Sequence, residues 1–196
     1  MKYATALLLF LAMALPAHMS AQIIHNAELS GGWAYSSGDF GLSGFNAGGA
    51  LWFTNRISVG FDFDRVGNNK SLPIFALTNA GIFTTKSTLY NYLIGPRISF
   101  GSKKIKVLET VNPFAEVEVG ASHIASTVSQ VNVGSVSASD NAGSWLVGGG
   151  ADVIFSPRWA VRTNFDYFRT HFVDQGQNRV RIKLGVAYTF RGRKVQ

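Results

Sequence analysis

The chain has 196 residues, of which 46% are hydrophobic and only 15% are charged, and it contains no cysteine. This composition excludes a disordered chain, and the missing cysteine excludes disulfide scaffolds, thiolate zinc sites and cysteine nucleophiles. The 18 Lys and Arg outweigh the 11 Asp and Glu to give a formal net charge of +7, and the length fits one ordered domain.

The N-terminal segment predicts a secretory signal peptide. One positive charge precedes an apolar run at residues 4–15, and the small residues Ser20 and Ala21 follow it. At about a dozen residues, this run is too short to cross ~30 Å of hydrocarbon as a helix, which argues against a membrane anchor. We therefore expect residues 1–21 to be cleaved and residues 22–196 to form the mature domain.

Beyond this segment, apolar residues recur at every second position, which is the pattern of β-strands. In one segment, for example, Ile57, Val59 and Phe61 alternate with Ser58 and Asp62. The pattern predicts eight strands, at residues 27–35, 44–53, 57–64, 90–100, 115–122, 144–155, 159–167 and 179–190.

The connections between these segments alternate in length. Residues 54–56 and 156–158 are tight turns, whereas residues 67–87, 125–141 and 170–177 form longer, polar connections. Short turns at one end and long loops at the other are typical of an up-and-down antiparallel barrel with both termini at the short-turn end.

The polar face of the strands favours a membrane barrel with a polar lumen over a soluble barrel with an apolar one. Glycines such as Gly60 and Gly148 are interleaved with charged residues, and a narrow eight-stranded lumen needs small neighbours beside long side chains. Buried charges must compensate one another. The charged side chains would either form a closed plug of ion pairs, which we favour, or line a thin ion path. The predicted lumen charge network consists of Glu28, Asp62, Asp64, Arg97, Glu116, Glu118, Asp152, Arg162, Asp166, Arg179, Arg181 and Lys183.

Aromatic residues on the apolar face gather near both ends of the predicted strands, as in the interfacial girdles of membrane barrels. Towards the long loops they are Trp33, Tyr35, Tyr90, Trp145 and Tyr167, and towards the turns they are Phe53, Phe100, Phe155 and Trp159. This clustering indicates that the apolar face contacts lipid.

The last predicted strand carries a more specific pattern. Lys183, Gly185, Tyr188 and Phe190 occupy the polar, glycine, aromatic and aromatic slots of a motif that resembles the C-terminal β-signal of outer-membrane barrels. The resemblance implies recognition by the outer-membrane barrel assembly machinery.

Further motifs are Tyr92-Leu-Ile-Gly-Pro-Arg97, Gly148-Gly-Gly-Ala-Asp152 and Ser156-Pro-Arg-Trp-Ala-Val-Arg162. In this order they resemble the small bacterial outer-membrane β-barrel proteins of the OmpA/OmpX type. The resemblance implies that residues 22–196 form an outer-membrane barrel domain. It would be an all-β, eight-stranded up-and-down antiparallel transmembrane β-barrel in the Gram-negative cell envelope, with both termini periplasmic. It corresponds to an OmpA-like transmembrane domain without the peptidoglycan-binding domain, and it implies a monomer surrounded by outer-membrane lipid and lipopolysaccharide.

Some small barrels of this kind are lipid A enzymes, but the sequence does not favour an enzyme here. His123 and Ser126 are three residues apart, a spacing that puts them on opposite faces of a strand. The histidines lack metal-ligand spacing, so we expect no catalytic residue, cofactor or metal. We also expect no nucleic-acid partner, because the excess cations fall in segments 103–106 and 191–194 on the turn side.

The long connections are the remaining candidates for function. Residues 71–83 are unusually apolar for an extracellular loop, and residues 128–136 alternate like a strand. Either the strands continue beyond the membrane as hairpins with adhesive edges, or the loops pack on one another. We therefore expect a structural or surface-interaction, adhesion-like barrel that binds a surface ligand through its loops. A small passive, porin-like ion pore is the second hypothesis and a lipid A-modifying enzyme the third.

Overall fold

The computed structural model describes residues 24–38, 41–76, 79–103, 110–130, 134–172 and 175–191. The expected signal peptide lies outside the described residues. Within the described ranges, no helix has the length and hydrophobicity needed to cross a membrane.

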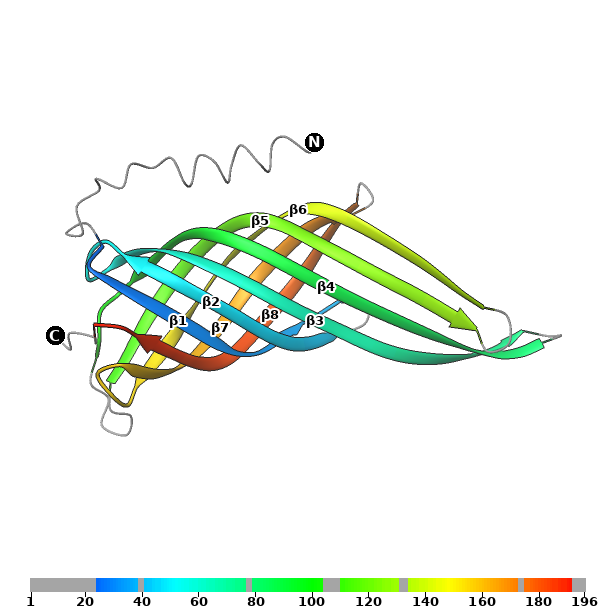
Figure 1. Cartoon of the computed structure of the whole chain (residues 1–196), viewed down its shortest axis with the longest axis horizontal. Coiled ribbons are helices and arrows are strands. Elements are labelled where there is room, and N and C mark those ends of the chain that lie inside the picture. Colours follow the sequence, from blue (N-terminus) through cyan, green and yellow to red (C-terminus); the bar gives the residue numbers. More distant parts are fainter. Residues whose placement is uncertain are drawn as a thin grey trace.

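The strands form a closed antiparallel barrel in which each strand pairs with its neighbours in chain order (Figure 1). β8 closes the barrel on β1, and their register runs from Glu28 opposite Thr189 to Ser36 opposite Arg181. This confirms the predicted eight-stranded up-and-down fold. The strands are β1 (Asn26–Ser36), β2 (Leu42–Trp52), β3 (Ile57–Ala76), β4 (Asn79–Ser99), β5 (Thr110–Gln130), β6 (Gly134–Ile154), β7 (Trp159–Phe172) and β8 (Gln175–Thr189).

Two tight turns lie where the sequence predicted them, at the end of the barrel where β1 begins and β8 ends. In the β2–β3 turn, the backbone N–H groups of Arg56 and Ile57 donate to Thr54 Oγ1 at 3.1 and 2.9 Å. In the β6–β7 turn, the N–H of Trp159 donates to the backbone oxygen of Ser156 at 3.2 Å. We call this the turn end of the barrel and the opposite end the loop end.

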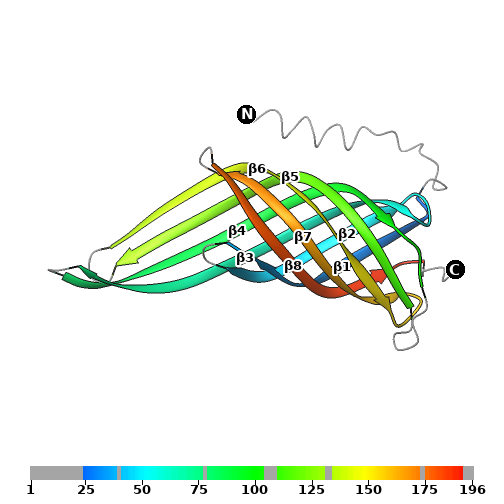
Figure 2. The ribbon, with the colours of Figure 1, turned by 180° about the vertical axis from the view of Figure 1, so that it is seen from behind.

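Most of the residues in the predicted long connections at 67–87, 125–141 and 170–177 continue the strands, so the structure has the hairpins that the sequence left as one of two alternatives. β3 and β4 stay paired as far as Ala76 opposite Asn79, and β5 and β6 as far as Gln130 opposite Gly134. Figures 1 and 2 show these two hairpins reaching far past the other strands. Their hydroxyl residues bond across strands, as Thr127 Oγ1 does with Ser137 Oγ at 2.9 Å, and such pairs stabilise sheets.

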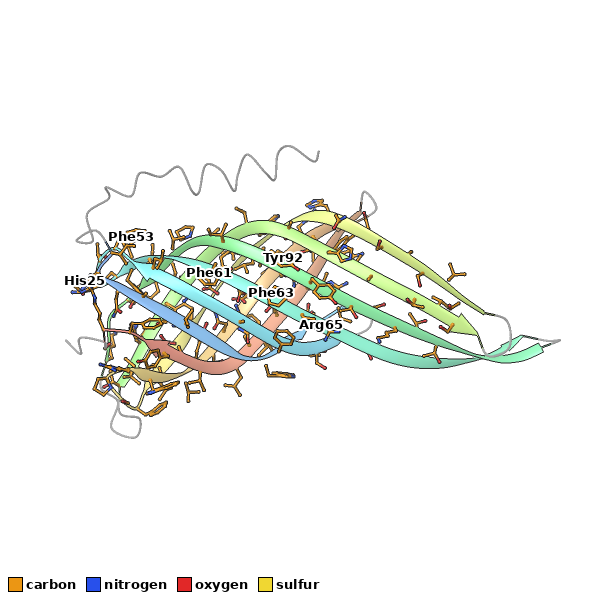
Figure 3. All side chains as sticks on the ribbon, viewed as in Figure 1. His25, Phe53, Phe61, Phe63, Arg65 and Tyr92 are labelled. Atoms are coloured by element: carbon orange, nitrogen blue, oxygen red, sulfur yellow. The ribbon has the colours of Figure 1, made fainter. Side chains whose placement is uncertain are left out.

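The alternation reverses its phase along several strands. In the turn-end part, the outside is apolar and the inside polar: in β7, Phe165 is exposed and Asp166 is buried. One step towards the loop end, Phe168 is buried inside and Arg169 points outward. β3 changes in the same way, since Arg65 follows Phe61 and Phe63 along its outer face towards the loop end (Figure 3).

The reversal marks the change from a lipid-facing wall to a water-facing one. A wall section in lipid turns apolar side chains outward, whereas one in water must turn them inward to bury them. In β7 the apolar outer face runs from Trp159 to Tyr167, which matches the roughly 9–11 residues that a tilted strand needs to span a membrane.

Candidate functional site

The lumen next to the turn end holds a cluster of ion pairs, the turn-side charge cluster. Arg162 forms a two-pronged contact with Asp152, with Nε to Oδ1 at 2.7 Å and Nη2 to Oδ2 at 2.8 Å, and its Nη2 also lies 2.6 Å from Glu28 Oε1. Arg97 contacts Glu116 Oε2 through Nε at 2.8 Å and Nη2 at 2.7 Å. The cluster therefore joins β1, β4, β5, β6 and β7 across the barrel.

An aromatic ring supports this cluster. The guanidinium carbons of Arg97 and Arg162 lie 4.8 and 5.0 Å from the centre of the Phe114 ring. Phe114 is itself buried and is the first inward residue of β5 beyond Asn112. Cation–π contacts of this kind gain strength when water is excluded.

A second group of ion pairs, the loop-side charge cluster, surrounds Arg181 on β8. Arg181 is fully buried and contacts Asp64, Asp62 at 2.8 Å and Asp166 at 3.1 Å. Lys183 Nζ lies 2.7 Å from Asp62 and 3.5 Å from Asp166. These contacts tie β8 to β3 and β7 through the middle of the lumen.

The two clusters are joined to each other and supplemented by amides. Lys183 Nζ lies 3.7 Å from Glu116, and Asn164 Nδ2 donates to the same carboxylate at 2.7 Å. On the loop side, Asn91 Nδ2 donates to Asp64 at 3.4 Å. The lumen is thus one connected polar network across most of its membrane-spanning height.

Three features of the predicted lumen network set some of its residues apart. Among the described residues, seven buried carboxylates face four buried cations, so bases alone do not balance the acids. Neither oxygen of Glu118 has a hydrogen-bond partner among these residues. Arg179 lies apart at the loop end, where it donates to Ser37 O at 3.3 Å and Gln177 Oε1 at 2.9 Å.

The lumen glycines serve two purposes. A Cβ on Gly60 would lie 3.2 Å from Glu118 Oε1 and 3.6 Å from Arg97 Nη2, so this glycine makes room for charged side chains. A Cβ on Gly95 would instead collide with the backbone oxygen of Val117 on the neighbouring strand. Gly95 therefore permits a close approach of two strands, which the sequence argument did not anticipate.

Towards the loop end, the lumen is filled by apolar side chains that the sequence argument missed. Arg181 marks the boundary, because its guanidinium lies 5.5 Å from the centre of the Phe168 ring. The signal for this cluster was the phase reversal, visible in β7 where Phe168 and Phe172 alternate with Arg169 and His171. This apolar cap consists of Ala34, Leu42, Val66, Leu89, Leu93, Ala142, Leu146, Phe168 and Phe172, with Ile124 packed against it.

The predicted girdle residues lie on the outer wall. At the loop-side boundary, the rings of Trp33 and Tyr35 are 6.1 Å apart, and those of Trp145 and Tyr167 are 5.7 Å apart. Tyr90 lies beside His123 at 6.0 Å, and Arg65 Nε donates to its hydroxyl at 3.3 Å. At the turn-side boundary the outer wall carries Phe53, Phe100, Phe155 and Trp159, all exposed.

The residues of the predicted β-signal lie on both faces of β8 and, for Phe190, directly after its last residue. Lys183 points into the loop-side charge cluster, whereas Tyr188 contacts Trp159 at 4.8 Å and Phe190 at 5.3 Å between ring centres on the outer wall. Gly185 lies opposite Gly32 of β1, where a side chain would strike the backbone of Gly31.

The pair considered for catalysis is separated by the strand. His123 Nδ1 lies 2.9 Å from Asn141 Oδ1, whereas Ser126 Oγ pairs with Ser87 Oγ at 3.0 Å. This pair therefore does not form a nucleophile and its base. Within the described ranges, no three His, Asp or Glu side chains are arranged to hold a metal ion.

At the loop end, β3 to β6 continue as a four-stranded sheet with two open edges, the loop-end sheet. Among the described residues, β3 residues 68–76 pair only with β4, and β6 residues 134–143 pair only with β5. Val136 of β6 is 76% exposed and lies opposite Val128, which is also exposed. Strand edges without partners are templates for pairing with another chain.

At the turn end, the lumen opens into a cavity of about 340 Å³, the turn-end cavity. Glu28 lies at its inner end and belongs to the turn-side charge cluster. Trp52, Ser99 and Asn112 also contribute to its lining, and Arg56 and Arg191 are exposed at its outer part.

A closed eight-stranded antiparallel barrel with short turns at one end, an apolar outer belt and a charged lumen has the fold of the small outer-membrane barrels. Among solved structures, that fold is shared by Ail, the attachment invasion locus protein of Yersinia pestis. The match has 19% sequence identity and a TM-score of 0.57, and it covers 84% of this chain and 98% of that chain. Ail was solved alone and in complex with the heparin analogue sucrose octasulfate.

Neisserial surface protein A is also similar, with 12% identity and a TM-score of 0.49 over 86% of this chain and 96% of that chain. No protein-family model matches the chain, and no curated protein has a significantly similar sequence.

Proposed function

We propose that the chain is an integral outer-membrane barrel that uses its loop-end sheet as an interaction surface. The observation that carries this proposal is the pair of open edges on β3 and β6, which extend beyond the closed part of the barrel. An extended segment of a surface protein can add to such an edge through main-chain hydrogen bonds. The β6 edge carries Ser135, Ser137, Ser139 and Asn141, which suits pairing in water.

The membrane location is supported by the outer belt and its two aromatic boundaries. Large apolar residues such as Ile94, Val119 and Phe165 are more than half exposed, which is unfavourable in water over so large an area. The orientation follows the usual arrangement, in which short turns are periplasmic and the longer connections are extracellular. Both termini would then be periplasmic, after removal of residues 1–21.

The partners follow from this location. Lipid and lipopolysaccharide would surround the belt, and the motif of Lys183, Gly185, Tyr188 and Phe190 would direct assembly. The complex of Ail with sucrose octasulfate shows that one protein of this fold binds a ligand, which is consistent with a ligand-binding surface here. We propose no enzymatic activity, since His123 and Ser126 point to opposite faces.

A closed lumen distinguishes this proposal from a passive pore. The apolar cap fills the loop end of the lumen, with Leu89, Leu146 and Phe168 fully buried, and an ion crossing it would lose its hydration without compensation. The charged residues below it would then stabilise the barrel rather than conduct.

Shortening both long hairpins tests the interaction surface. Residues 70–85 and residues 128–136 are each replaced by Asn-Gly, which keeps the registers of Asn69 with Lys86 and Thr127 with Ser137 and supplies a two-residue hairpin turn. Bacteria that display the shortened barrel should adhere to epithelial cell monolayers at least about tenfold less than those displaying the full chain. A shift in electrophoretic mobility between unheated and heated samples checks that both barrels are folded. Equal adherence by the two strains would contradict the proposal.

A further inference from the structure

The turn-end cavity is a separate feature that the proposed function does not use. Its volume of about 340 Å³ lies at the lower end of the range of small-molecule sites, roughly 300–1,000 Å³. The cavity lies inside the barrel wall, because Glu28, Trp52 and Ser99 on its lining are inward residues of β1, β2 and β4. It is therefore open to a water-soluble ligand rather than to a lipid in the surrounding membrane.

The electrostatics of the cavity differ between its outer and inner parts. Within the described part of the chain, the charged side chains of Lys, Arg, Asp and Glu exposed at the turn end are all cationic: Arg56, Lys103, Arg158 and Arg191. Of these, Arg56 and Arg191 line the cavity. At the inner end, Glu28 is buried against Arg162 at 2.6 Å. An anionic group is thus favoured at the rim and disfavoured at the floor.

The remaining lining is suited to hydroxyl and amide groups. Asn26, Asn112 and Ser102 are partly exposed there, and Trp52 adds a largely buried aromatic ring. Several of these groups are held in place: Ser99 Oγ donates to Asn112 Oδ1 at 2.6 Å, and Asn26 Oδ1 accepts from the backbone N–H of Ala27 at 2.9 Å. Apolar ring surface combined with a few fixed polar groups is characteristic of ligand sites.

We propose that the turn-end cavity binds a small acidic sugar, with the carboxylate at the Arg56 and Arg191 rim and the hydroxyl and amide groups towards Asn112 and Glu28. In the orientation proposed above, the cavity faces the periplasm, where acidic amino sugars of the cell wall occur. The size of the cavity limits the bound part to about one sugar ring.

Isothermal titration of the full-length folded barrel in detergent micelles tests this proposal with two matched sugars. N-acetylmuramic acid carries a carboxylate that N-acetylglucosamine lacks, while the two share the ring, the acetamide and most hydroxyls. We expect the acidic sugar to bind at least about tenfold more tightly, as a charge-assisted contact predicts. Absence of binding by N-acetylmuramic acid, or equal affinity for the two sugars, would overturn the proposal.

Two matched arginine variants locate the site. Arg56→Gln removes a rim cation, and Arg158→Gln removes another exposed cation from the other tight turn, outside the cavity. Arg56→Gln should weaken N-acetylmuramic acid binding about tenfold, whereas Arg158→Gln should leave the affinity unchanged. Equal weakening by both variants would mean that only overall charge matters and would refute the site. Because neither side chain lies in the core, both variants should fold, and gel mobility checks this.

Discussion

Replacing Arg162 by alanine should destabilise the barrel strongly without preventing its insertion. Arg162 is buried, pairs with Asp152 through two contacts of 2.7 and 2.8 Å, and lies 2.6 Å from Glu28. The substitution leaves two buried carboxylates without this guanidinium. Arg97 lies 3.5 Å from Glu28, farther than the 2.6 Å contact of Arg162 that the substitution removes.

The expected loss of stability follows from the free-energy cost of an uncompensated buried charge. Removing one partner of a buried ion pair typically costs about 3–5 kcal/mol, because the other charge stays buried. The lost contact of Arg162 with the Phe114 ring, at 5.0 Å, adds in the same direction. The apolar outer belt and the last strand are unchanged, so the variant should still insert.

A double-mutant cycle separates the ion pair from other effects. Equilibrium urea unfolding in lipid vesicles, followed by tryptophan fluorescence, gives the free energies of unfolding. The double variant Arg162→Ala with Asp152→Ala should lose less free energy of unfolding than the two single variants lose in sum, with a coupling energy of about 1.5 kcal/mol or more. Arg158→Ala, at an exposed turn position, is the control and should lie within about 0.5 kcal/mol of the parent chain. A similarly small effect of Arg162→Ala would refute the stabilising role of the cluster.

Two further predictions concern the strand packing and the lumen. Gly95→Ala should lower the free energy of unfolding by about 1–3 kcal/mol, because the added Cβ would meet the backbone oxygen of Val117. Gly143→Ala is the control: its Cβ would meet nothing within 4 Å, so the free energy of unfolding should change by less than about 0.5 kcal/mol. Equal effects of the two variants in urea unfolding would contradict the close approach of the strands at Gly95. In planar bilayers the chain should give no steady conductance, because the apolar cap fills the lumen at its loop end, and a steady single-channel current would disprove the seal.

Most of the barrel was predictable because apolar and polar residues alternate with a period of two along its strands. Inward and outward residues alternate along every strand, so the inward positions of Asp62, Glu116 and Arg162 followed from their outward neighbours. Pairing partners within the lumen were not predictable. Arg181 meets carboxylates from β3 and β7, and which side chains meet inside a barrel depends on strand tilt and stagger, to which the period of two is insensitive.

The loop end was harder to predict for a related reason. Ser, Thr and Asn are common in loops, but here they continue the strand pairing, as Ser87 and Ser126 do with a 3.0 Å contact between hydroxyls. The sequence left hairpins and packed loops as alternatives, because residues 77–78 and 131–133 lack the Asn-Gly or Asp-Gly pair that signals a tight hairpin turn. A pattern with one fixed apolar face does not predict the apolar cap, because the apolar residues change from the outer face to the inner face along the strands.

The phase change links the architecture to the proposed function. A barrel that ended at the membrane surface would need no apolar lumen, because lipid already covers its apolar side chains. A wall that continues into water loses that cover, and only an interior core such as Leu146 with Phe168 can hold it together. The same core anchors the bases of β3 to β6 through Val66, Leu89, Ile124 and Leu146, so the loop-end sheet begins at a packed support. Sealing the lumen and presenting the open edges are therefore two consequences of one packing arrangement, and weakening the cap should impair both together.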